Sequence, residues 1–265
     1  MYSLRLTCKP EEVDLVLADL YEAGTVGVRE LDEGDSCILI AGFETNQSRL
    51  ELLGAFADYS PEWFAEDTTD WQKVSQNAWR VREIGRSFLL APFWSEEPTP
   101  HGRIRLIHNP GLACGTGEHP CTRLALGALE DCVSAGMTVV DVGTGSGILA
   151  VGAMRLGAES VIGIDIDCAA VLYARENFAL NGLRSALACG SVDALDESSS
   201  DVTVANISAT VLLTIWDDLL RVTRRPGYLI LTGFQSSESR VIEELLPHPT
   251  ISEEEDWVCL ATRLS

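Results

Sequence analysis

The stretch 138–149, TVVDVGTGSGIL, combines residue types that could hold a charged ligand. An apolar strand carrying Asp141 runs into three glycines at alternate positions, Gly143, Gly145 and Gly147, and then into an apolar helix. Glycines in such a turn let the backbone approach a ligand closely and enter a helix N-terminus sharply. Asp141 would repel a pyrophosphate and attract an ammonium group. It therefore favours S-adenosylmethionine over a dinucleotide, although the glycines also satisfy the looser dinucleotide pattern G-x-G-x-x-A.

Polar side chains also end the apolar runs that follow the glycine turn. Asp165 ends VIGID and is placed to accept hydrogen bonds from ribose hydroxyls, with Asp167 as a competing candidate that could instead cap the next helix. Asp193 in GSVD could bond an adenine amino group, or it could serve the loop. Asn206 ends VAN and could orient an amine nucleophile through its amide carbonyl, or it could cap a helix.

A glycine-rich segment, NPGLACGTGEHPCT at residues 109–122, precedes these strands and reads as a lid over the cofactor. We expect Gly117 to contribute to cofactor binding. Thr122, near a helix start, could bond the methionyl carboxylate with help from the local dipole. His119 could accept a proton, and a structural role is an equal alternative. No His/Cys cluster has metal-ligand spacing, so we expect no metal.

The elements that must position these residues alternate between strand and helix, which is typical of an α/β fold with a parallel sheet. The predicted strands are 138–142, 160–165, 186–189, 201–206 and 227–233. The predicted helices are 120–132, 147–156, 168–181, 209–223 and 236–245. Two final strands, 249–252 and 256–263, should complete the sheet as a hairpin. Ligands of such sheets bind outside the carboxyl ends of the strands, where the candidate residues fall.

The first 60 residues predict a separate ferredoxin-like α+β domain, with the order strand, helix, strand, strand, helix and a closing strand near Trp63. We interpret residues 1–60 as a recognition domain, 61–110 as a linker and cap segment, and 111–265 as the cofactor domain. The cap segment should hold a helix from Asp70 to Trp79 and strands at 87–92 and 103–107. Its aromatic side chains could cap the core of the cofactor domain or face the substrate.

The composition limits the classes of partner. A net charge of −21 argues against nucleic-acid binding and suits a basic protein substrate or simply a solvated acidic surface. The eight cysteines are scattered and include no C-x-x-C pair, so we expect several of them to act as small apolar residues in a reducing cytosol. No signal peptide and no apolar run of membrane-spanning length is present, which predicts a cytoplasmic protein without membrane contact.

Several motifs together resemble the ribosomal protein L11 methyltransferase family: NPGLACGTGEHPCT, DVGTGSGILAVGAMRLGA, VIGIDID, ARENFALNG and VANI. The resemblance covers nearly the whole chain. It implies a class I methyltransferase, Rossmann-like fold with a mostly parallel seven-stranded sheet, behind an N-terminal recognition domain and a linker. It also implies S-adenosylmethionine as cofactor, bound by Thr122, Gly143, Asp165 and Asn206. The expected reaction is methylation of lysine side chains or the α-amine of ribosomal protein L11, and we expect a monomer.

The lid departs from the family pattern at Cys114, where Phe is usual, and at Glu118, where Thr is usual; Cys121, Thr144 and Ser208 also differ. These departures bear on the substrate more than on the cofactor. They keep two alternatives open: a methyltransferase for lysines of another protein and a non-catalytic S-adenosylmethionine-binding module. A third alternative, a nicotinamide-dependent oxidoreductase, is suggested by Gly145, Gly147 and Ala150, which match the dinucleotide pattern.

Overall fold

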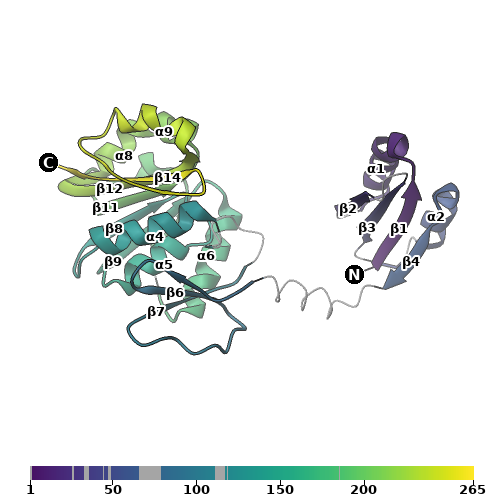
Figure 1. Cartoon of the computed structure of the whole chain (residues 1–265), viewed down its shortest axis with the longest axis horizontal. Helices are drawn as coiled ribbons and strands as arrows, with labels where there is room; N and C mark the ends of the chain where they lie inside the picture. The colour runs from purple at the N-terminus through teal and green to yellow at the C-terminus, as the bar shows by residue number, and fades with distance from the viewer. Residues whose placement is uncertain are drawn as a thin grey trace. The chain divides into compact units, whose positions relative to one another are not determined.

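The structure is a computed structural model that describes all residues except 1, 26, 33–35, 44, 47–48, 66–78, 111–116, 118 and 185. It contains two compact units, Met1–Ala78 and Trp79–Ser265, which we describe separately (Figure 1). The helix predicted between Asp70 and Trp79 falls almost entirely outside the described residues. The departures at Cys114 and Glu118 also lie outside them.

The first unit is a four-stranded sheet in the order β2-β3-β1-β4, with every neighbouring pair antiparallel. Leu4, Leu6 and Leu39 of the sheet pack against Val16 and Leu20 of α1, because apolar residues four apart share one helix face. This is the predicted ferredoxin-like order. Its elements are β1 (Tyr2–Cys8), η1 (Pro10–Glu12), α1 (Val13–Glu22), β2 (Gly27–Asp32), β3 (Cys37–Phe43), α2 (Arg49–Ala55), η2 (Ala57–Tyr59) and β4 (Glu62–Ala65).

A small three-stranded sheet opens the second unit and consists of β5 (Arg82–Ile84), β6 (Phe88–Pro92) and β7 (Ile104–His108). Phe88, Leu90 and Leu106 are buried in the same core as the helices that cover the large sheet. The segment predicted as linker and cap is therefore divided: β4 pairs with β1 in the first unit, whereas β5–β7 build the core of the second. Phe93, by contrast, is half exposed.

The large sheet of the second unit has seven strands in the order β10-β9-β8-β11-β12-β14-β13. All neighbouring pairs are parallel except those that β14 makes. The order reverses between β8 and β11, which is the switch point where such sheets bind ligands. The strands are β8 (Thr138–Val142), β9 (Ser160–Asp165), β10 (Ala186–Cys189), β11 (Ser200–Asn206), β12 (Thr223–Gln235), β13 (Thr250–Glu254) and β14 (Trp257–Leu264).

Helices cover both faces of this sheet and bury two apolar cores (Figure 1). One face carries α4 (Pro120–Cys132), α5 (Ile148–Arg155) and α6 (Cys168–Leu180), and the other carries α7 (Ala209–Thr214), α8 (Trp216–Val222) and α9 (Ser236–Glu243). Bounds for α4, β8, β9 and β10 agree with the sequence prediction. The helix predicted over 209–223 is instead two helices, because Ile215 leaves helical geometry at φ −104° and ψ 18°.

The cysteines show two behaviours. Cys8, Cys121, Cys132 and Cys259 are buried and form no disulfide, as expected for small apolar residues. Cys168 and Cys189, however, form a disulfide, which the sequence analysis did not predict, because 21 positions separate two residues that the fold brings together. None of the described helices is long and apolar enough to cross a membrane.

Candidate active site

The glycine turn after β8 is built for close backbone approach. Gly143, Gly145 and Gly147 have φ values of +71°, +53° and +77°, which side chains strongly disfavour. A Cβ at Gly143 would lie 2.5 Å from Cγ2 of Ile207. The amide of Gly143 donates to the carbonyl of Ile164 at 2.8 Å, which folds the turn over the end of β9. The turn thus presents backbone at the start of α5 without side chains in the way.

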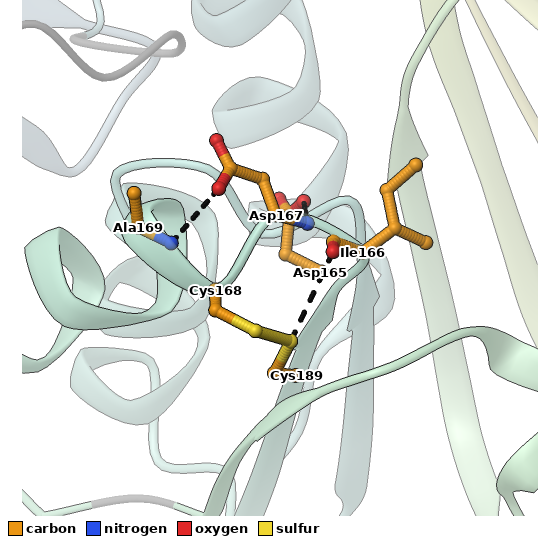
Figure 2. The surroundings of a disulfide bond; sticks show 6 residues. All are labelled: Asp165, Ile166, Asp167, Cys168, Ala169 and Cys189. Carbon is orange, nitrogen blue, oxygen red and sulfur yellow. Dashed lines mark hydrogen bonds between the residues drawn. A yellow bond between two sulfur atoms is a disulfide. The ribbon is translucent and has the colours of Figure 1, made fainter.

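Asp165 ends β9 beside this turn. Its Oδ2 accepts from the amide of Gly145 at 2.9 Å, and its Oδ1 accepts from the amide of Asp167 at 3.0 Å. Each carboxylate oxygen has a further lone pair, so both remain able to accept from ribose hydroxyls. Asp167 instead caps α6 by accepting from the amide of Ala169 at 2.8 Å (Figure 2). The geometry therefore favours Asp165 over Asp167 as the ligand-facing carboxylate.

Asn206 ends β11 on the other side of the switch point. Its Nδ2 donates to Oγ1 of Thr122, in the first turn of α4, at 3.2 Å. Because the N-cap position of α7 is Ser208, Asn206 does not cap that helix. The hydrogen bond to Thr122 uses the donor end of the amide and leaves the carbonyl oxygen as the acceptor.

His119 is the N-cap residue of α4. Its Nδ1 accepts from the amide of Cys121 at 3.4 Å, and its ring meets Trp257 edge to face with centroids 4.4 Å apart. A neutral histidine whose Nδ1 accepts carries its proton on Nε2, so taking up another proton at Nδ1 would remove the cap. The contacts with Cys121 and Trp257 support the structural alternative for His119, and its role as a proton acceptor stays a prediction.

An ion pair joins the C-terminal hairpin of β13 and β14 to α4, next to the contact between His119 and Trp257. Arg123 donates to both carboxylate oxygens of Glu254, from Nη2 at 2.6 Å and from Nε at 3.0 and 3.2 Å. Such bidentate charged pairs fix orientation as well as distance. The clamp holds the end of β13 at α4, and Trp257, which pairs with Glu254 in the hairpin, lies beside it.

These elements surround a cavity of about 920 Å³, within the range of small-molecule sites. Six of the sequence-predicted site residues line it: His119, Thr122, Gly143, Gly145, Asp165 and Asn206. They come from α4, β9, β11 and the turn after β8. The cavity therefore lies at the carboxyl edge of the sheet, as predicted from the topology.

The structure does not bring Asp141 to the cavity wall, contrary to the prediction that it contacts the cofactor. Asp141 has 0% exposure, and its Oδ2 accepts from Oγ1 of Thr144 at 2.7 Å and from the amide of Ala150 at 3.2 Å. These hydrogen bonds hold the glycine turn and the start of α5 in place from inside the core. Burial raises its pKa to about 7. Its Oδ1 has no hydrogen-bond partner within the described part of the chain.

Gly117 and Asp193 also lie away from the described wall of the cavity. Gly117 has a φ of +93°, and a Cβ there would lie 2.2 Å from Cδ2 of Leu90, so glycine is required by packing. Asp193 is exposed in η3 (Val192–Ala194), where its backbone carbonyl accepts from Arg221. The neighbouring Val192 lines the cavity in its place.

Several apolar residues of the wall were missed by sequence reasoning, among them Ile166, Val211, Ile215 and Trp257. The antiparallel pairing of Trp257 with Gln235 sets the start of β14 beside the ends of the parallel strands. The sequence did carry a signal for one further residue of the cavity wall, Gly233. Gly233 is an isolated glycine in a strand, which commonly marks a bulge, and the register does shift there.

Comparison with known proteins agrees with this geometry. Residues 54–265 match the family model described as ribosomal protein L11 methyltransferase (PrmA). The chain belongs to the ribosomal protein L11 methyltransferase family. A relative of that name from Pseudomonas paraeruginosa is 32% identical over 287 residues, which cover 98% of this chain and 97% of that protein. Another, from Shouchella clausii, is 36% identical over 202 residues, 73% of this chain and 64% of that protein.

Solved structures give the same result. A ribosomal protein L11 methylase from Lactobacillus delbrueckii subsp. bulgaricus has a TM-score of 0.65 and 33% identity, and the match covers 71% of this chain and all of that one. A 16S rRNA methyltransferase from T. thermophilus, solved with AdoMet and guanosine, has a TM-score of 0.54 at 17% identity, which speaks to the fold alone. Family membership confirms the class I methyltransferase fold and S-adenosylmethionine dependence, and it excludes the nicotinamide-dependent oxidoreductase.

Proposed function

We propose that this chain transfers methyl groups from S-adenosylmethionine to amino groups of ribosomal protein L11, on lysine side chains, the α-amine or both. The observation that carries the proposal is one cavity at the switch point. It joins the glycine turn and Asp165 on one side to Asn206 on the other. The family places this chain among methyltransferases that act on that ribosomal protein.

The cofactor half of the cavity lies over β8, β9 and β10. Asp165 would accept from the ribose hydroxyls, and the amides of the glycine turn and the hydroxyl of Thr122 would receive the methionyl part. The positive φ values of Gly143 and Gly145 support this fit, because glycine adopts them readily and its bare backbone lets a ligand approach closely. S-adenosylmethionine, when bound, supplies an electrophilic methyl group on a sulfonium.

The acceptor half lies over β11 and β14. Thr122 holds the amide of Asn206, so its carbonyl oxygen can accept from an amine N–H and aim the nitrogen lone pair at the methyl group. Val211, Ile215 and Trp257 provide an apolar wall along which the methylene chain of a lysine can lie. This wall also excludes water from the neutral amine.

Charge supports a basic substrate. The net charge of −21 gives the chain a long-range attraction for a cationic protein and repels nucleic acid. Within this proposal the first unit recognises the ribosomal protein, and the enzyme acts as a cytoplasmic monomer. We keep residues 1–60 as recognition domain, 61–110 as linker and cap, and 111–265 as methyltransferase domain as a proposed functional division, in which β4 completes the sheet of the first unit and β5–β7 pack into the core of the second.

The test compares three variants. Asp165→Asn should weaken S-adenosylmethionine binding about tenfold to hundredfold in calorimetry, since hydrogen bonds to a charged group are worth about 1.5–3 kcal/mol. Asn206→Ala should lower the methylation rate about 100-fold, by a larger factor than it weakens S-adenosylmethionine binding, because positioning of the amine is lost. Asp193→Asn is the matched control, since Asp193 lies off the described wall, and it should behave like the unaltered enzyme.

Methylation is read by mass spectrometry of purified ribosomal protein L11, as a ladder in steps of one methyl group. Cofactor binding without a ladder would point to lysines of another protein or to a non-catalytic module. Equal loss of affinity in the Asp165 and Asp193 variants would contradict the assignment of the cofactor half.

A further inference from the structure

The disulfide between Cys168 and Cys189 lies next to Asp165 and Ile166, two residues that line the cavity (Figure 2). Cys189 is the last residue of β10, and Cys168 is the first residue of α6, with their Cα atoms 5.0 Å apart. Both residues are exposed, so soluble thiols can reach the bond. Disulfides in reducing compartments are usually transient and redox-sensing rather than structural.

The residues next to each cysteine form part of the cavity wall. Asp165 and Ile166 precede Cys168, and residues 190–192 follow Cys189; all of them line the cavity. The two segments also touch directly, because the amide of Gly190 donates to the carbonyl of Asp165 at 2.8 Å. The disulfide therefore joins covalently two pieces of the wall that hydrogen bonds already hold together.

The strand that carries Cys189 has little other support. β10 is an edge strand of four residues and pairs only with β9 in the described sheet. Short edge strands are among the least stable parts of a sheet. Ile166, on the other segment, is 80% exposed and lacks the packing that would fix it. The segment after β10 thus depends for its position on the disulfide, the pairing with β9 and the Gly190–Asp165 hydrogen bond.

We propose that Cys168 and Cys189 are a reversible redox modification site, and that the oxidised form holds the cofactor half of the cavity in its binding geometry. The proposal rests on the proposed function, because it takes Asp165 and residues 190–192 as the wall that receives the adenosine part. The chemical partner is a dithiol, either a small molecule or a protein.

Reduction is an ordinary thiol–disulfide exchange. A thiolate of the dithiol attacks one sulfur, the S–S bond breaks, and the other cysteine leaves as a thiolate that takes up a proton. The second thiol of the reductant then attacks the mixed disulfide, loses its proton and releases the first cysteine as a thiol. The cysteine pair gains two electrons and two protons, and the dithiol becomes a disulfide.

The structure also indicates how far reduction would loosen the wall. Cys189 Sγ lies 3.8 Å from the carbonyl oxygen of Ile166 (Figure 2). A disulfide sulfur carries no hydrogen, so only the reduced thiol can donate to that oxygen. Reduction would thus allow this weak bond to form, and the Gly190–Asp165 hydrogen bond should persist. We therefore expect affinity to fall by about threefold to tenfold, the cost of ordering two freed segments, rather than to vanish.

Linkage makes the effect reciprocal. If the oxidised form binds the cofactor more tightly by some factor, then the bound cofactor favours the oxidised form by the same factor. The redox equilibrium is thus a second readout that needs no catalysis.

The experiment uses S-adenosylhomocysteine as the probe, titrated calorimetrically into the full chain after oxidation by oxidised glutathione or reduction by dithiothreitol. The oxidised protein should bind it about threefold to tenfold more tightly. The double variant Cys168→Ser/Cys189→Ser should bind as the reduced protein does under both conditions. Cys37→Ser, which removes a half-buried free thiol of the first unit, is the matched control and should keep the redox dependence.

A redox titration completes the test. The pair is equilibrated in glutathione buffers with and without S-adenosylhomocysteine, and the alkylated thiols of the peptides holding Cys168 and Cys189 are counted by mass spectrometry. The ligand should shift the oxidised-to-reduced ratio by the factor found calorimetrically. Equal affinities of the two forms, no shift, or redox dependence that survives in the double variant would overturn the proposal. Absence of binding in both forms would instead overturn the cofactor site itself.

Discussion

The difference in unfolding free energy between the Asp141→Asn variant and the unaltered chain should change in favour of the variant as the pH increases. Asp141 is fully buried, and only one of its carboxylate oxygens has partners among the described residues. Loss of hydration raises its pKa from 3.8 to about 7, against the opposing hydrogen bonds from Thr144 and Ala150. The folded protein therefore holds a proton that the unfolded chain has released above pH 4.

The sign and size follow from linkage. Where the folded state binds more protons than the unfolded state, the free energy of unfolding falls as the pH rises. The contribution is fully present below pH 3.8 and is lost progressively up to about pH 7. Between pH 5.5 and pH 8, the unfolding free energy that is lost because of Asp141 is about 2 kcal/mol. This range stays above the pI of 4.4.

Asparagine has nearly the same shape, keeps an acceptor for Thr144 and Ala150, and does not titrate. The difference in unfolding free energy, variant minus unaltered chain, should therefore rise by about 2 kcal/mol from pH 5.5 to pH 8. Urea unfolding followed by circular dichroism measures this difference. The transition with the larger m-value is the one to analyse, because the m-value grows with the size of the unit that unfolds and Asp141 lies in the larger unit. Other titrating groups cancel in the difference. A pH-independent difference would show that Asp141 ionises normally in the folded state and would refute the reasoning.

Two further predictions concern the core of the second unit. Burial lowers the pKa of His108 to about 4, so the unaltered chain should lose stability as the pH falls below 6.5. The variant His108→Phe does not titrate there and keeps an aromatic contact for Trp79. Between pH 7.5 and pH 5.5, urea titrations should therefore show that its unfolding free energy falls by about 1 kcal/mol less than that of the unaltered chain. Gly117→Ala should cost about 2–4 kcal/mol, because the new methyl meets the buried Leu90 and the positive φ is retained. Gly102→Ala has a similar φ of +83° but open space around it, so thermal melts should show a distinctly smaller loss; equal losses would contradict the packing argument.

Much of the fold could be predicted from the sequence because local signals agreed. Helix α4 begins at Pro120 behind a capping residue, and β8 to β10 are short apolar runs bounded by glycines and polar turns. The break at Ile215 was missed because no glycine or proline marks it. Asp217 and Asp218 nevertheless lie in the first turn of α8, where acidic residues are common, and they were the available signal.

Site residues that lie at the ends of parallel strands could be predicted from the sequence. Residues whose position depends on how distant strands pair could not. Asp165 and Asn206 follow from the rule that parallel strands end at one edge. Asp141 lies on a strand buried on both faces, so the sequence could not tell which face its side chain takes. Trp257 reaches the cavity only through the antiparallel register of the last hairpin, and the Cys168–Cys189 bond depends on the pairing of β9 with β10.

The clamp between Arg123 and Glu254 joins residues 131 positions apart in the chain. Closing so long a loop carries a large entropic cost, and long-range contacts of this kind form slowly. During synthesis the first strands of the sheet can therefore pair long before the last hairpin has been made. Until then the edge of β12 that pairs with β14 is unpaired, and the cavity wall lacks Trp257. The nascent methyltransferase is thus most exposed to aggregation in the interval just before its final strand docks.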